Sequence, residues 1–354
     1  MNLERVEQIA DAVLYEGYML YPYRPSSVKN QRRWNFGVLC PPTYCEAAQG
    51  SESSFMQTEC LLRADSTTRL TVKVRFLQIV QRSIGRFIGA GGDGQESDDA
   101  CLECVDRLEL DGRVYQPWQE AVERELTYES LDPASLFWAP SLEFNFFEDK
   151  EREDLLDTRH RRQGMIVRQW KTLRGTVQIR TTACRDNIVK LTVRVENLSH
   201  FDPTAADDYS GREAALPFSL VSAHTVLGVE NGEFLSLLDP PASMADLAGQ
   251  CENKGTFPVL AGEEATTMLA SPIILYDHPS IAPESAGNLF DATEIDEILS
   301  LRILTLTDEE KREMRESDDR TRELLLRTES MPDEQFIKLH GILRGLGLVK
   351  GKPQ

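Results

Sequence analysis

Strict alternation of apolar and polar residues in two stretches, 70–76 and 189–195, constrains the fold of this chain more than any other feature. In both stretches every second residue is Leu, Val or Phe, and the residues between them are Lys, Arg or Thr. This period of two is that of a half-buried β-strand. Residues 3–17 instead repeat their apolar side chains at helical spacing, which predicts an N-terminal helix.

Turn signals support an antiparallel arrangement of the predicted strands. The pairs Asp111-Gly112 and Asn231-Gly232 accept the positive φ of a tight turn, so we expect a hairpin to turn at each of them. No amphipathic helix separates the short strands between residues 163 and 238, as expected for an antiparallel sheet. The sequence therefore predicts an α+β protein in which residues 1–288 form an antiparallel β-sandwich-like body with the N-terminal helix attached.

Helical patterning returns near the C-terminus. Asp291 with Glu294, and Thr307 with Glu310, have the spacing of capping boxes that begin two helices. The second of these helices is very polar and carries charge pairs at i,i+4, and a third is predicted from near residue 330. We therefore expect a C-terminal helical extension over residues 289–354.

A basic, aromatic stretch from Tyr15 to Cys40, here called the basic island, contrasts with the net charge of −19. No Asp or Glu occurs between Gly17 and Cys45. Because Arg recognises carboxylates with several donors, and Tyr and Trp offer rigid contact area, we expect the island to bind a partner protein. The alternatives are that its rings cover the open end of the sheet, or that it binds a nucleotide or another anion. The predicted contact residues are Tyr21, Tyr23, Arg24, Lys29, Arg32, Arg33, Trp34 and Phe36.

Composition limits the partners of this chain. The sequence pI of about 4.8 argues against nucleic acid or an anionic membrane as the main partner, because both attract positive charge. No export signal or membrane-length apolar run occurs, and seven cysteines without a signal indicate reduced thiols in the cytoplasm. Residues 93–157 hold twenty acidic and five basic residues. We expect them to form a solvated surface with charged loops, or to complement the basic island within the chain or across a homo-oligomer.

No motif in the sequence fixes a reaction. Cys101 and Cys104 have the CxxC spacing that lets two thiolates bind one metal, but the acidic residues around them disfavour thiolates, so they are weak metal candidates. His224 lies in an apolar strand, which is typical of a hydrogen-bonded core histidine. His200 precedes several aspartates that either bind a hard cation or belong to a surface loop. We predict no catalytic residue, no metal and no cofactor.

Several stretches of the sequence are distinctive. They read LYEGYMLYPYRPSSVKN from residue 14, RWNFGV from residue 33, SLVSAHT from residue 219, ILYDHP from residue 274 and LFDATEIDEIL from residue 289. Together they resemble an uncharacterised bacterial family encoded among the accessory genes of uptake nickel–iron hydrogenases. The resemblance implies a cytoplasmic helper in hydrogenase assembly, metal delivery or complex formation, and it carries no catalytic residues over to this chain.

Two functions follow as expectations. The first is a non-enzymatic accessory or scaffold protein that assists assembly or maturation of a nickel–iron hydrogenase by binding a hydrogenase subunit or a maturation factor. The alternative is an enzyme of unknown chemistry whose site lies near Tyr21–Phe36 and His224.

Overall fold

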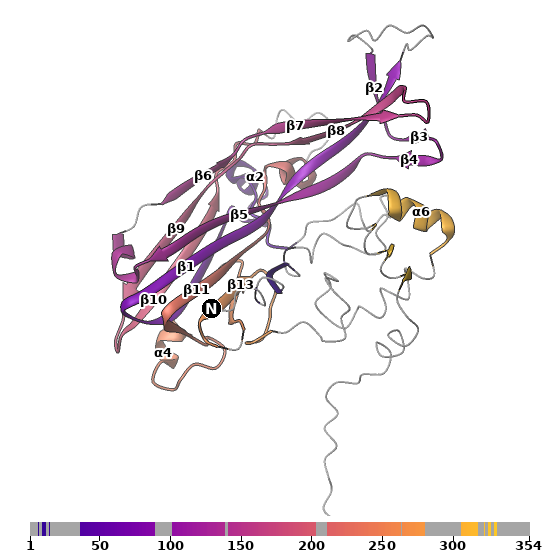
Figure 1. Cartoon of the computed structure of the whole chain (residues 1–354). Coiled ribbons are helices and arrows are strands. Elements are labelled where there is room, and N and C mark those ends of the chain that lie inside the picture. Colours follow the sequence, from indigo (N-terminus) through magenta and orange to yellow (C-terminus); the bar gives the residue numbers. More distant parts are fainter. Residues whose placement is uncertain are drawn as a thin grey trace, which may run out of the picture.

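The computed structural model is mostly antiparallel β-sheet (Figure 1). It describes residues 6, 9–11, 14, 36–88, 101–138, 141–202, 211–262, 264–279, 306–317, 322, 325–326 and 329–330. Eleven of the described strands form one hydrogen-bonded sheet, and a separate hairpin makes a second sheet of two strands. No helix in this described part is long and apolar enough to cross a membrane.

Strand β1, Phe55–Ile88, organises the sheet because it pairs with five other strands. At about 3.3 Å per residue its 34 residues follow a path of roughly 110 Å, and Figure 1 shows it crossing most of the molecule. Its partners, in the order in which it meets them, are β10 (Ile188–Asn197), β11 (Val221–Leu235), β5 (Trp118–Leu131), β8 (Arg162–Trp170) and β2 (Cys101–Val105).

The remaining strands extend the sheet outward from these partners. Strand β9 pairs with β10 and then with β6, β13 pairs with β11 and then with β12, and β7 pairs with β8. Their bounds are β6 Leu142–Phe146, β7 Asp149–Leu156, β9 Leu173–Ala183, β12 Phe257–Leu260 and β13 Thr267–Ser271. The short helices are α2 Pro42–Ala47, η2 Pro133–Trp138, α3 Arg212–Ala215, η3 Leu216–Phe218 and α4 Ala245–Ala248.

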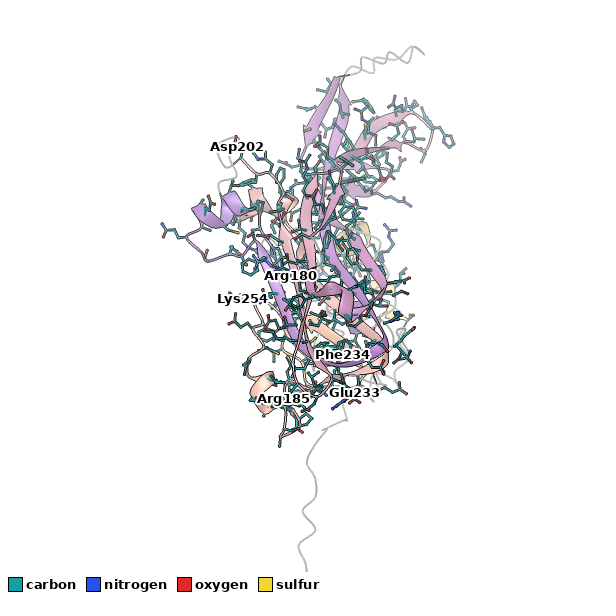
Figure 2. The ribbon with its side chains drawn as sticks, turned by 90° about the vertical axis from the view of Figure 1, so that its left-hand side faces the viewer. Arg180, Arg185, Asp202, Glu233, Phe234 and Lys254 are labelled. Carbon is teal, nitrogen blue, oxygen red and sulfur yellow. The ribbon has the colours of Figure 1, made fainter. Side chains whose placement is uncertain are left out.

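The two alternating stretches are strands, as predicted. Stretch 70–76 lies within β1 and stretch 189–195 within β10. Their apolar residues point to one face and are buried, apart from the half-buried Val189, and the residues between them are partly exposed, apart from the buried Arg75. In β9, likewise, Ile179 is buried, whereas Arg180, labelled in Figure 2, is exposed.

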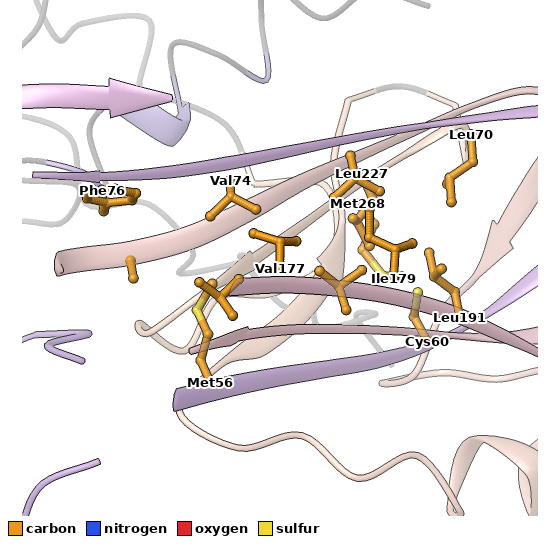
Figure 3. Close-up of a cluster of buried hydrophobic side chains, with 14 of the residues drawn as sticks. Met56, Cys60, Leu70, Val74, Phe76, Val177, Ile179, Leu191, Leu227 and Met268 are labelled. Carbon is orange, nitrogen blue, oxygen red and sulfur yellow. The ribbon is translucent and has the colours of Figure 1, made fainter. Parts of the chain in front are cut away.

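One buried hydrophobic cluster draws side chains from both halves of β1 (Figure 3). Met56 and Cys60 come from the first half, and Leu70 and Val74 from the second. A four-residue bulge at 65–68 lies between the two halves. The cluster also contains residues of β9, β10, β11 and β13, among them Val177, Ile179, Leu191, Leu227 and Met268.

One of the two predicted hairpins is confirmed. Strands β3 (Leu108–Leu110) and β4 (Arg113–Tyr115) turn at Asp111 and Gly112, with φ values of 51° and 79°.

The hairpin predicted at Asn231-Gly232 is wrong, because β11 continues through this pair without reversing. Gly232 lies opposite Ala64, and Glu230 lies opposite Arg69. The positive φ of Asn231, 53°, bends β11 at the bulge of β1 instead of reversing the chain. Glycine is required at 232 because a Cβ there would lie 2.8 Å from the backbone oxygen of Arg63.

Helical segments are described in part at both ends of the chain. Residues 6, 9–11 and 14 are helical, and the apolar ones among them are buried against β11, β12, β13 and their neighbours. Helix α6, Asp308–Ser317, begins at the predicted second capping box: Glu310 accepts the Thr307 N–H at 2.8 Å, and Thr307 Oγ1 accepts the Glu310 N–H at 3.3 Å. The first box, the third helix and the boundary at residue 288 lie outside the described residues.

The far end of the molecule forms a narrow extension, here called the arm, built from β2, β3, β4, β7, β8 and the adjoining parts of β1 and β5 (Figure 1). A small apolar cluster of Ile84, Leu108, Leu155 and Ile166 holds its layers together. The layers approach closely because Gly164 has no side chain: a Cβ there would lie 2.4 Å from Leu108 Cδ2.

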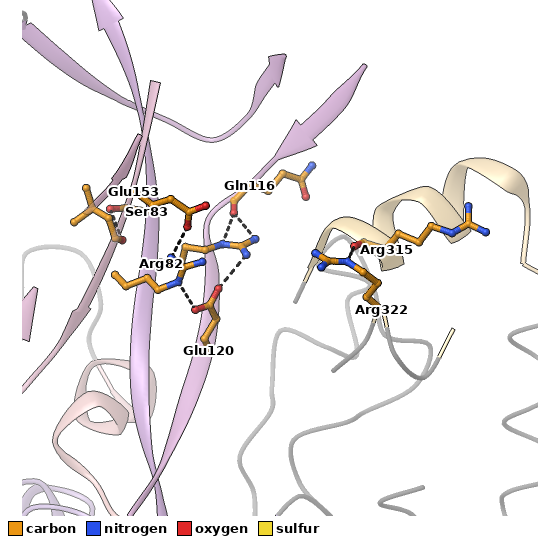
Figure 4. Close-up of polar contacts among 9 residues, drawn as sticks. Arg82, Ser83, Gln116, Glu120, Glu153, Arg315 and Arg322 are labelled. Atoms are coloured by element: carbon orange, nitrogen blue, oxygen red, sulfur yellow. Dashed lines mark hydrogen bonds and ion pairs between the residues drawn. The ribbon is translucent and has the colours of Figure 1, made fainter. Parts of the chain in front are cut away.

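Much of the acidic segment is strand and not loop, since β5, β6 and β7 all lie within it. Some of its carboxylates bind arginines from other strands of the sheet. Glu120 accepts hydrogen bonds from Arg82 at 3.0 Å and from Arg168 at 2.8 Å, and Glu153 accepts one from Arg168 at 2.8 Å (Figure 4). Part of the charge that we assigned to a solvated surface therefore links β1, β5, β7 and β8.

Candidate protein-docking surface

The structure describes one of the eight predicted contact residues of the basic island, Phe36. The other seven, Tyr21, Tyr23, Arg24, Lys29, Arg32, Arg33 and Trp34, lie outside the described residues. Phe36 is 43% exposed.

The end of the island is fixed to β11 by backbone hydrogen bonds. The carbonyl of Phe36 accepts the Ser222 N–H at 3.2 Å, and the carbonyl of Gly37 accepts the Ala223 N–H at 2.9 Å. Gly37 has φ of 54°, and a Cβ on it would lie 2.6 Å from Cγ of Pro272. Glycine therefore permits both the turn and the close approach to the segment that begins at Pro272.

Residues 272–278, here called the arch, are anchored at both ends. At the start, Ser271 Oγ donates to the Ile273 carbonyl at 2.8 Å. At the end, the Asp277 carboxylate accepts the Leu260 N–H at 2.8 Å and the Ser236 hydroxyl at 2.5 Å. The His278 N–H also donates to the Leu260 carbonyl at 2.7 Å. These bonds tie the arch to β12 and to the end of β11.

Between its anchors the arch alternates half-buried and exposed apolar side chains. Ile273 and Leu275 pack on the cluster that includes Val226 of β11 and Val259 of β12. Ile274 and Tyr276 point away from it and are 74% and 86% exposed. Large apolar side chains held in a fixed backbone are the usual anchors of protein interfaces, because covering each one contributes about 1.5–3 kcal/mol.

A buried polar pair lies near the point where the island joins β11. His224 of β11 and Arg75 of β1 are directly opposed, and His224 is fully buried. His224 Nδ1 lies 2.9 Å from the Ser222 carbonyl. Burial lowers the pKa of His224 to about 4, so its ring is neutral at pH 7 and Nδ1 carries the proton that this carbonyl accepts. The prediction of a hydrogen-bonded core histidine is confirmed.

Arg75, the partner of His224 in this pair, also contacts three acidic side chains. Its guanidinium contacts Asp11 at 2.7 Å, Glu123 at 3.4 Å and Glu125 at 3.5 Å. Within the described part of the chain, Arg75 Nη1 and His224 Nε2 have no hydrogen-bond partner. The structure thus brings Phe36 and His224 to the same residue, Ser222, as the alternative enzyme hypothesis requires, but it encloses the imidazole completely.

The cysteines contribute no grouped site among the described residues, where no cluster of three or more His, Cys, Asp or Glu side chains could hold a metal ion. Cys104 is exposed on β2, whose backbone pairs Cys101 with Ile88. Burial raises the pKa of Cys40 to about 12, and it also raises the pKa of Cys60, so both thiols are protonated at neutral pH.

In comparisons with known proteins, no protein-family model matches the chain, and no curated protein matches it.

Sequence reasoning missed Ile274 and Tyr276 as candidate contact residues. The signal was present, because the apolar run IILY lies between Pro272 and Pro279, outside any strand-length alternation. An apolar run between two prolines with no strand pattern is a candidate for an anchored, exposed segment.

Proposed function

We propose that this protein is a non-enzymatic accessory or scaffold protein that binds a partner through the arch and the adjoining end of the basic island. The observation that carries the proposal is the pair Ile274 and Tyr276, two largely exposed apolar side chains on a backbone anchored at both ends. An anchored backbone loses little conformational entropy on binding, so most of the free energy gained by covering these side chains contributes to affinity.

We further propose that the partner is a subunit or maturation factor of a nickel–iron hydrogenase, in the cytoplasm. The support is the resemblance described above: two of the stretches that carry it, RWNFGV and ILYDHP, include Phe36 and Tyr276. A third, SLVSAHT, contains the Ser222 to which Phe36 is bonded. As a finer proposal about the fold, the two halves of β1 belong to opposed layers of a β-sandwich-like body, which the cluster shared between them favours.

The test uses a bacterial strain from which the gene is deleted and then restored as variants. Ile274→Ser with Tyr276→Ser removes the exposed apolar area while leaving Ile273, Leu275 and the anchoring bonds in place. The matched control is Phe147→Ser, which removes a side chain of 71% exposure that follows β6.

We expect the control to restore hydrogenase activity and the double variant to fail, although both reach wild-type levels in the cell. Affinity capture of tagged protein should recover a hydrogenase subunit or maturation factor with wild type and the control, and lose it with the double variant. Full restoration of activity by the double variant would refute the arch as the contact. Unchanged hydrogenase activity in the deletion strain would refute the hydrogenase link itself.

A further inference from the structure

Strand β7 leaves one of its edges unpaired in the described part of the chain. It pairs with β8 from Asp149 to Leu156, and no described strand pairs with its other edge. Six consecutive residues of β7, 149–154, are charged and exposed. A long exposed edge is a template for another β-strand, and charged side chains decide which strand it accepts.

From 149 to 153 the charges of β7 are sorted by face. Since successive side chains of a strand point to opposite faces, Asp149, Glu151 and Glu153 share one face, and Lys150 and Arg152 share the other. Asp154 also lies on this second face, where it pairs with Arg162 at 2.8 Å. Glu153 is bound to an arginine of β8. Lys150, Glu151 and Arg152 form no ion pair with any described residue, so their charges are available to an incoming strand.

A second copy of this chain is a poor occupant of this edge. Two copies related by a twofold axis would pair their β7 strands antiparallel, and directly opposed residues would then share a face. In every register the acidic face of one copy would meet the acidic face of the other. With the axis at Glu151, Lys150 would also face Arg152. Like charges directly opposed across strands destabilise the pairing.

We propose that the free edge of β7 binds an extended segment of another protein in which basic and acidic residues alternate. In the antiparallel arrangement the partner places Lys or Arg opposite Asp149 and Glu151, and Asp or Glu opposite Lys150 and Arg152. Backbone hydrogen bonds supply the attachment, and four complementary cross-strand pairs select the sequence. This edge is separate from the arch and is formed by different strands.

The test uses two synthetic peptides of identical composition between flanking threonines, one with the central sequence Glu-Lys-Glu-Lys and one with Glu-Glu-Lys-Lys. The full-length protein is compared with the double variant Lys150→Glu with Glu151→Lys. This exchange keeps the net charge and the residues but turns the alternating pattern of 149–152 into two acidic residues followed by two basic ones. Neither exchanged side chain has an ion pair within the described residues, so the fold should be unaffected, which circular dichroism checks.

Wild type should bind the alternating peptide about tenfold more tightly than the block peptide by fluorescence anisotropy, because four favourable pairs replace two favourable and two unfavourable ones. The double variant should reverse this preference. Hydrogen exchange measured by mass spectrometry should show new protection at 149–156, and added salt should weaken binding. Equal binding of the two peptides, no binding of either, or association of the wild-type chain with itself through β7 would overturn the proposal.

Discussion

Burial of His224 makes the stability of this protein depend on pH in a way that can be measured. The side chain is fully buried beside Arg75, and its pKa falls from 6.5 to about 4 because the charged ring would lose its hydration and face a guanidinium. In the unfolded chain the same ring titrates near its ordinary value. The unfolded state therefore binds one more proton than the folded state between these two values.

The sign and size follow from linkage. Above its pKa in the unfolded chain, a histidine whose pKa is lowered by folding leaves the free energy of unfolding unchanged. As the pH falls from that value toward the pKa in the folded state, the unfolded chain takes up a proton that the folded state does not, so the folded state loses stability. The difference of about 2.5 pKa units corresponds to about 3 kcal/mol once the pH is below both values. The pI near 4.8 reduces solubility there, so the useful interval is from about pH 7 to about pH 5.5. Over this interval the expected loss from His224 alone is about 1 kcal/mol.

The assay is urea unfolding at several pH values for wild type, His224→Gln and the control His200→Gln, which changes a solvent-exposed histidine. All carboxylates are common to the three proteins, so the difference between wild type and His224→Gln isolates the buried ring. The free energy of unfolding of wild type should fall by about 1 kcal/mol more than that of His224→Gln between the two pH values, and His200→Gln should follow wild type. Parallel pH curves for wild type and His224→Gln would refute the assignment of a neutral, buried imidazole.

Two further predictions concern the arm. Glu120→Gln removes the carboxylate that binds Arg82 and Arg168. It should lower the free energy of unfolding, measured in urea, by about 2 kcal/mol. The control Glu151→Gln changes an exposed residue and should alter this free energy by less than about 0.5 kcal/mol. Gly164→Ala would place a Cβ 2.6 Å from the backbone oxygen of Gly85, which cannot move aside, and should cost about 1–3 kcal/mol in the same assay. Gly249→Ala is its control, because a Cβ at 249 would lie 3.4 Å from its nearest neighbour, the backbone oxygen of Ala245. Equal free energies of unfolding of the two alanine variants would contradict the close packing of the arm.

The parts of the fold that sequence predicted are those in which local chemistry decides the outcome. Alternation in stretch 189–195 fixes both the strand and its buried face, because a shift of one residue would expose every apolar side chain. The turn at Asp111-Gly112 and the capping box of Thr307 with Glu310 likewise depend only on neighbouring residues. Each of these elements was predictable because no distant part of the chain is needed to form it.

The parts that sequence missed depend on residues far apart in the chain. The turn chemistry of Asn231 was recognised, but whether the chain reverses there depends on the bulge in β1, more than 160 residues away. The strands β5 and β7 are rich in acidic residues, and arginines of β1 and β8 meet carboxylates of both strands. Arg82 and Glu120 are separated by 38 residues, so no local pattern indicates their pairing.

The candidate site was predictable to a similar extent. The proximity of the Tyr21–Phe36 region to His224 was expected, and the described end of that region, Phe36, bonds to the same residue as His224. The exposure of Ile274 and Tyr276 was not, because it depends on Asp277 reaching Leu260 and Ser236 in other parts of the fold.

The two surfaces that we propose as contacts, the arch and the edge of β7, should differ in how strongly salt affects their binding. The arch offers apolar area, so its affinity should be insensitive to salt, whereas the edge of β7 offers opposed charges in solvent, whose attraction falls as salt screens it. The arch substitution Tyr276→Ser and the β7 exchange at Lys150 and Glu151 therefore have distinguishable signatures. If one partner occupied both surfaces, each change would weaken the same complex, but only the exchange in β7 would reduce the salt dependence of binding. If the surfaces serve two partners, each change should leave the other complex at wild-type affinity. Among the described strands, β12 and the end of β11, which carry the arch, are connected to β7 and β8 only through β1.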